Sequence, residues 1–184
     1  PLIAAQKFDS TSFLQAFLAF IAFNSTASSV YILNDFLDIK ADRNHPKKCK
    51  RPLAAGDLSF SLGSILGIFL LLIGSIFGFI IGGLFLAALL FYYSITVFYS
   101  TYLKRKALVD IFVLSSLYTI RLQAGGIATN LEISFWLLAF STFIFLSLAA
   151  IKRQSELIDL INRDKDFVEN RGYKKSDLSF IRTL

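Results

Sequence analysis

The fold of this chain is decided by residues 58–103, LSFSLGSILGIFLLLIGSIFGFIIGGLFLAALLFYYSITVFYSTYL, a run of 46 residues without a charged side chain. A helix that crosses a membrane needs about 20 predominantly apolar residues, so this run is long enough for two crossings. We expect it to fold back at a glycine-rich patch formed by Gly74, Gly78, Gly82 and Gly83. The stretch therefore predicts a pair of antiparallel membrane helices.

Three further apolar segments flank this pair. Residues 10–34 and 133–151 carry no charge, and residues 107–128 carry only Asp110 and Arg121. Because 55% of the 184 residues are apolar, a membrane protein is the expected class. We predict an all-α polytopic transmembrane bundle with five spans, in which residues 1–184 form a single membrane-embedded domain.

The positive charges indicate an orientation. Of the 19 Lys and Arg residues, all but Lys7 and Arg121 lie in residues 40–51, 104–106 and 152–182. Basic connections are retained in the cytoplasm, so these three segments are expected there. No soluble basic face remains for nucleic acid, and we expect no nucleic-acid partner. We expect an integral protein of a bacterial inner or cell membrane, embedded in lipid, with its active site facing the cytoplasm.

Three aspartates stand where the first apolar segment ends. If that segment stays helical, Asp35, Asp38 and Asp42 are spaced i, i+3 and i+7 and share one face. Like charges so close together at a membrane boundary need a cation. One interpretation is that water or the cations Arg43, Lys47 and Lys50 neutralise a solvated helix end. The other is a magnesium ion, which prefers hard oxygen ligands and bridges them to substrate phosphates.

The residues after the aspartates favour the magnesium interpretation. Lys47, Lys48, Lys50 and Arg51 follow in a loop bounded by Pro46 and Pro52, and Ser59 can cap the next helix. Carboxylates for a metal and cations for phosphate oxygens are the groups that a diphosphate site needs. We interpret His45 as a loop residue and Cys49 as a spacer.

Two motifs in this region carry a family resemblance. NDFLDIKADR (residues 34–43) resembles the first aspartate-rich motif of the UbiA-type intramembrane prenyltransferases, and RPLAAGDLS (residues 51–59) resembles the motif that follows it. The resemblance implies a bundle of nine helices, of which this chain would cover about helices two to six and be incomplete at both ends. Residues 1–8 would end an earlier helix, and residues 176–184 would begin a later one.

The same resemblance implies a Mg²⁺ cofactor, transfer to or from a polyprenyl lipid, and a role for Asn34 beside Asp35, Asp38 and Asp42 at the metal. DRNHPKKCKRPLAAG, YSTYLKRKALVD and RLQAGGIATNLEISFWL further resemble the decaprenyl-phosphate phosphoribosyltransferase subgroup. Members of this subgroup move a phosphoribosyl group from phosphoribosyl diphosphate to a polyprenyl phosphate, in the synthesis of lipid-linked sugars for the cell envelope.

One difference from the family pattern distinguishes the aromatic-prenylating subgroup from the phosphoribosyltransferase subgroup. Members that prenylate aromatic acceptors carry a second acidic motif after helix six, whereas this chain reads AAIKRQSEL, with Lys152 at the first acidic position and Glu156 four residues on. Two acidic motifs suit a prenyl diphosphate held by two metal ions. One acidic and one basic motif suit a Mg²⁺-bound diphosphate donor beside a second phosphorylated substrate.

Charges inside the fourth span remain open to two interpretations. Asp110 either begins that helix at the interface or faces the bundle interior, and Arg121 either pairs with an acid on a neighbouring helix or holds phosphate. We assign catalysis to Asp35, Asp38, Lys104 and Arg121 and metal binding to Asp35, Asp38 and Asp42. The residues expected at substrate phosphates are Asn34, Arg43, Lys47, Lys50, Arg51, Tyr99, Lys104, Arg121, Lys152, Arg153 and Glu156.

Two alternative functions remain open. The nearer is prenyl transfer from a prenyl diphosphate to an aromatic or lipid acceptor. The more distant is a transporter subunit, for which Asp110 and Arg121 would lie on the pathway and Mg²⁺ would be irrelevant. Homo-oligomerisation is left open.

Overall fold

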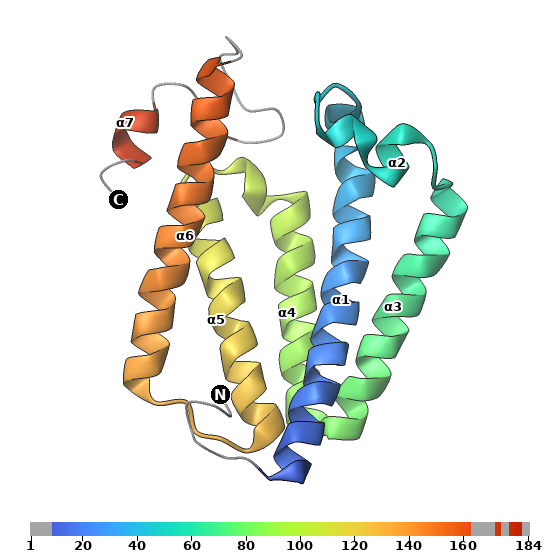
Figure 1. Ribbon diagram of the computed structural model, residues 1–184, viewed down its shortest axis with the longest axis vertical. Coiled ribbons are helices and arrows are strands. Elements are labelled where there is room, and N and C mark those ends of the chain that lie inside the picture. Colours follow the sequence, from blue (N-terminus) through green and yellow to red (C-terminus); the bar gives the residue numbers. More distant parts are fainter. Residues whose placement is uncertain (1–8, 163–171, 174–176, 182–184) are drawn as a thin grey trace. The chain divides into compact units, whose positions relative to one another are not determined.

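The described part of the chain is built from helices. A computed structural model describes residues 9–162, 172–173 and 177–181, and Figure 1 labels its helices. Residues 1–8, expected to end an earlier helix, lie outside the described residues, as do all six cations beyond residue 162. The elements in chain order are α1 (Ser10–Arg43), η1 (Lys48–Lys50), α2 (Pro52–Ala55), α3 (Phe60–Ile81), α4 (Gly83–Thr101), η2 (Leu103–Arg105), α5 (Val109–Thr129), α6 (Phe135–Asn162) and α7 (Leu178–Ile181).

The five predicted spans are confirmed. Five helices, α1, α3, α4, α5 and α6, are long and apolar enough to cross a membrane. Many large apolar side chains on them are exposed, among them Phe79 at 75% and Trp136 at 81%. So much apolar surface is typical of helices that face lipid rather than water.

The described residues form two compact units whose boundaries fall inside α4, inside α5 and just before α6. Unit 1 consists of the described residues up to 97 together with residues 120–133. Unit 2 consists of residues 98–119 and the described residues from 134 onward.

In unit 1, α1 and α3 pack side by side and are joined at one end through α2 (Figure 1). Asp9 caps the start of α1 by accepting a hydrogen bond from the Ser12 backbone N–H at 2.9 Å. The Thr11 hydroxyl and this N–H hold the pKa of Asp9 well below its usual range. As predicted, Ser59 caps α3 and accepts a hydrogen bond from the Leu62 N–H at 3.3 Å.

The glycine-rich patch divides between two roles, which corrects the expectation that all four residues form the turn. Gly82 alone ends α3, with a φ of 147° that side chains rarely adopt, and α4 begins at Gly83. Gly74 and Gly78 lie inside α3 and are buried. A Cβ atom on Gly74 would stand 2.2 Å from Thr26 Oγ1 and 3.0 Å from the Ala22 carbonyl oxygen, both on α1. Small residues at this face let the two helices approach closely, as is common between membrane helices.

We predict that Gly74→Ala destabilises the α1–α3 pair by about 1–3 kcal/mol, because the added methyl group must push aside a β-branched side chain and a backbone carbonyl. The measurement is the thermal unfolding midpoint of the protein in detergent. Gly83→Ala is the matched control, since a Cβ atom there meets nothing within 4 Å. Equal midpoints for the two variants would contradict the prediction.

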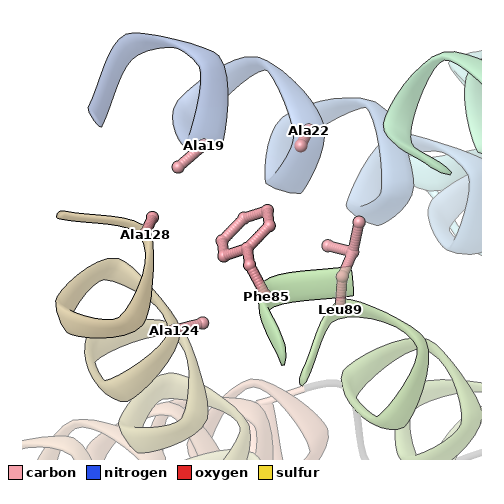
Figure 2. Close-up of a cluster of buried hydrophobic side chains, with 6 residues drawn as sticks. All are labelled: Ala19, Ala22, Phe85, Leu89, Ala124 and Ala128. Atoms are coloured by element: carbon pink, nitrogen blue, oxygen red, sulfur yellow. The ribbon is translucent and has the colours of Figure 1, made fainter. Parts of the chain in front are cut away.

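The core of unit 1 joins three helices. Figure 2 shows small alanines of α1 and α5 arranged around Phe85 and Leu89 of α4. Phe85 and Leu89 are each 1% exposed, and Phe23 of α1 meets the Phe85 ring edge-on at a centroid distance of 5.7 Å. This packing fixes the parts of α1, α4 and α5 that belong to unit 1.

Unit 2 has two small apolar clusters. Ile111 of α5 packs with Ala149 and Ala150 of α6. Leu157 of α6 packs with Tyr173 and with Ile181 of α7. The second cluster brings the residues after α6 against Ala107, in the connection between α4 and α5.

Candidate functional site

The acidic end of α1 is the first candidate site. The helix continues to Arg43, so the predicted helical spacing of Asp35, Asp38 and Asp42 is confirmed. The Arg51 guanidinium lies between two of them, with Nη1 at 2.8 Å from Asp35 Oδ1 and 2.8 Å from Asp42 Oδ2. The Asp42 side chain is only 3% exposed. These two carboxylates therefore converge on one cation.

The conformation of the loop after α1 places Arg51 beside Asp35 and Asp42. His45 Nδ1 accepts hydrogen bonds from the backbone N–H groups of Lys47 and Lys48, each at 3.2 Å, which turns the chain into η1. Arg51 then stands immediately before Pro52, the first residue of α2. On the other side, Arg43 Nε donates to the Ala54 carbonyl at 3.2 Å and ties the end of α1 to α2. His45 is thus a loop residue, as predicted, and its side chain caps the turn.

The donor chemistry at this helix end fits Mg²⁺ in part. Asp35 and Asp42 present hard oxygen atoms to a shared positive group, and Arg51 stands in for that cation. Over the described ranges, however, no three His, Cys, Asp or Glu side chains are close enough together to hold a metal ion. A divalent ion at this place must therefore displace or rearrange the Arg51 guanidinium.

The remaining predicted residues of unit 1 lie at varied depths. Lys47 and Lys50 are exposed, as is Arg43, whereas Asn34 and Arg121 are half-buried. Arg121 Nη2 donates a hydrogen bond to the Tyr92 hydroxyl, and its guanidinium carbon lies 5.0 Å from the centre of the Tyr92 ring. Arg121 thus contacts a phenol of the neighbouring helix α4, and the choice between an acidic partner and a phosphate ligand stays a prediction.

A buried charge network in unit 2 is the second candidate site. Arg153 is 1% exposed and lies on α6, and its Nε is 2.6 Å from Asp110 Oδ2, whose side chain is 0% exposed. Arg153 Nη1 pairs with Glu156, and its Nη2 donates to the Tyr99 hydroxyl at 3.3 Å. Asp110 therefore faces the interior of unit 2. Two residues predicted at substrate phosphates, Glu156 and Tyr99, contact a third, Arg153.

Sequence reasoning missed one member of this network, Tyr173. Its hydroxyl donates to Asp110 Oδ1 at 2.7 Å and accepts a hydrogen bond from the Leu108 backbone N–H at 2.9 Å. Burial, and next the hydrogen bond to Asp110, raise the pKa of Tyr173 well above its usual range. No signal in the sequence pointed to it, because a single tyrosine in a hydrophilic segment has no pattern.

The two predicted lysines of unit 2 differ in exposure. Lys104, in η2, is 3% exposed, whereas Lys152 on α6 is exposed. Lys152 is thus the member of the KRxxE sequence whose ammonium group can meet a ligand from outside, while Arg153 beside it is enclosed.

The spans and the charged helix ends define the class first: a polytopic helical membrane protein with carboxylates and cations gathered where its spans end. The particular family follows from comparison. The model of the UbiA prenyltransferase family matches residues 2–171, and the chain belongs to that family.

Relatives with curated names agree with this placement. The chain is 38% identical to nodulation protein NoeC of Azorhizobium caulinodans, over 91% of this chain and 54% of that protein. It is 36% identical to decaprenyl-phosphate phosphoribosyltransferase of Mycobacterium tuberculosis, over 91% of this chain and 56% of that enzyme. It is 32% identical to the enzyme of the same name from Corynebacterium glutamicum, over 82% of this chain and 46% of that enzyme. The chain thus spans about half the length of these relatives.

Proposed function

We propose that this chain is the acidic-motif part of a Mg²⁺-dependent membrane transferase that moves a phosphoribosyl group from phosphoribosyl diphosphate to a polyprenyl phosphate. The family and the phosphoribosyltransferase relatives support this class of reaction. The choice of phosphoribosyl diphosphate as donor rests on the KRxxE sequence of α6. There an exposed Lys152 stands beside a buried Arg153 that is paired with Asp110.

The acidic helix end takes the donor in this proposal. Asp35, Asp38 and Asp42 would hold Mg²⁺, and the exposed Lys47 and Lys50 would bind oxygens of the donor diphosphate. When bound, Mg²⁺ supplies a positive charge that stabilises the departing diphosphate. Arg51, once it leaves the two carboxylates, is free to turn its fork of donors toward the same phosphates.

Unit 2 takes the acceptor. Lys104 and Lys152 would bind the phosphate of the lipid and orient one of its oxygens for attack. In the transfer, the bond between the anomeric carbon and the diphosphate oxygen breaks, and a bond from that carbon to the lipid phosphate oxygen forms. By the positive-inside rule, the basic segments would face the cytoplasm in this proposal.

The experiment that tests the proposal offers two labelled donors to membranes that contain the intact protein and polyprenyl phosphate. Label from phosphoribosyl diphosphate should enter the lipid fraction, and chelation of Mg²⁺ should stop it. Label that enters only from prenyl diphosphate would favour the prenyl transfer that the family description names. Transport activity indifferent to Mg²⁺, with no transfer of label, would favour a transporter subunit.

Arg121 provides a further test within α5. We expect Arg121→Gln to lower kcat/KM for transfer by about tenfold or more, because a charge-assisted contact to phosphate is lost. Arg121→Lys, which keeps the charge, should recover part of the loss. If Arg121→Gln leaves both KM and kcat unchanged in folded protein, Arg121 has no part in phosphate binding.

A further inference from the structure

The connection between α4 and α5 is held by residues that follow α6. At Gly172 the backbones approach so closely that a Cβ atom would lie 2.2 Å from the Arg105 carbonyl oxygen and 3.1 Å from the Ala107 nitrogen. Only glycine fits such an approach. The next residue, Tyr173, is 2% exposed and packs with Leu157 and Ile181. Residues 172–173 therefore pack against the α4–α5 connection through both their backbone and the Tyr173 side chain.

The Tyr173 hydroxyl bridges two points of this connection. It accepts the Leu108 N–H at 2.9 Å and donates to Asp110 Oδ1 at 2.7 Å, two residues further along. Leu108 has a φ of 66°, a left-handed conformation that costs free energy for a residue with a branched side chain. The hydroxyl thus stabilises a bend that this sequence does not favour by itself.

The same connection carries Lys104, which the proposed function assigns to the lipid phosphate. Lys104 lies in η2, four residues before Leu108, and is 3% exposed. A buried ammonium group has little room to adjust, so its position depends on the backbone that carries it. Asp110, held by Tyr173, also pairs with Arg153, the neighbour of Lys152. Tyr173 therefore contacts both the connection that carries Lys104 and, through Leu157, the helix α6 that carries Lys152.

We infer that Tyr173 is a positioning residue of the transfer reaction: its hydroxyl fixes the α4–α5 connection and thereby the place of the Lys104 ammonium for the phosphate of the polyprenyl acceptor. This inference rests on the proposed function. Tyr173 does not itself bind substrate. It affects acceptor binding indirectly, because its hydrogen bonds to Leu108 and Asp110 hold the backbone that carries Lys104.

The test uses Tyr173→Phe in the intact membrane protein, because phenylalanine keeps the ring that fills the cluster and removes only the hydroxyl. We expect the KM for polyprenyl phosphate to rise about tenfold, while the KM for phosphoribosyl diphosphate stays unchanged. Hydrogen exchange at the Leu108 amide should become at least about tenfold faster, since its acceptor is gone. Tyr102→Phe is the matched control, a hydroxyl removed from an exposed ring in the same connection.

A double-mutant cycle identifies the route of the effect. In a Lys104→Gln background, Tyr173→Phe should raise the KM for polyprenyl phosphate no further. A full additional increase in that background would overturn the inference, because the effect would then bypass Lys104. A lower kcat with both KM values unchanged would overturn it too, since that is the result of a purely structural role.

The exchange measurement separates this inference from the proposed function. If the unsubstituted protein transfers no phosphoribosyl group, the proposed function fails, and the assigned role of Lys104 fails with it. If the unsubstituted protein is active and Tyr173→Phe leaves exchange at Leu108 unchanged, the proposed function stands and the positioning role of Tyr173 is wrong.

Discussion

Asp35→Asn should reduce Mg²⁺-dependent transfer by at least about a hundredfold in kcat/KM. Asparagine keeps the shape of the side chain but removes the negative charge that would hold the metal, and the loss of one metal ligand weakens the stabilisation of the departing diphosphate. The measurement is label transfer from phosphoribosyl diphosphate over a range of Mg²⁺ concentrations. Part of the loss should be recovered at high Mg²⁺, because the remaining carboxylates still bind the ion weakly.

Asp57→Asn is the control for this change. Asp57 is exposed in the connection between α2 and α3, so the same loss of charge occurs near the site without touching the acidic helix end. Its activity should equal that of the unsubstituted protein. Full activity of Asp35→Asn at low Mg²⁺ would refute the role of Asp35 in metal binding.

Arg153→Met is expected to destabilise unit 2 by about 3–5 kcal/mol. The substitution leaves Asp110, which is 0% exposed, without the guanidinium that neutralises it, and a buried charge that loses its partner is costly. A second substitution, Asp110→Leu, should recover most of the loss, because a buried ion pair replaced by apolar side chains of similar size is often neutral. The measurement is the unfolding midpoint of each variant in detergent.

Arg105→Met is the control for the arginine change. Arg105 is exposed, and its substitution removes the same group from the surface of the same unit. A midpoint for Arg153→Met that matches the Arg105→Met midpoint would show that the network contributes no stability. A double variant less stable than Arg153→Met alone would show that the charge of Asp110 is satisfied by other groups.

The spans could be read from the sequence because membrane crossing depends on local properties. Twenty apolar residues in a row span a bilayer whatever surrounds them, and the five spans are confirmed at nearly the predicted places. The spacing of Asp35, Asp38 and Asp42 on one face is likewise local, since it follows from the helical repeat. The cap at Ser59 depends only on its neighbours and is also confirmed.

The roles of the glycines could not be read in the same way. Gly74 and Gly82 look alike in the sequence, since both interrupt an apolar run. The first lies against Thr26 of another helix and the second ends α3, and only the packing of α1 on α3 separates these roles.

The sequence by itself determined the membrane class, the number of spans in this chain, and the residues gathered at the acidic helix end. The tertiary structure decided which charges meet. Arg51 reaches Asp35 and Asp42 across 16 and 9 residues, and Tyr173 reaches Asp110 across 63. Periodicity describes neighbours along one helix, whereas such pairs depend on how helices and loops pack. That is why the contacts of Glu156 and Tyr99, both with the buried Arg153 of unit 2, could not be read from the sequence.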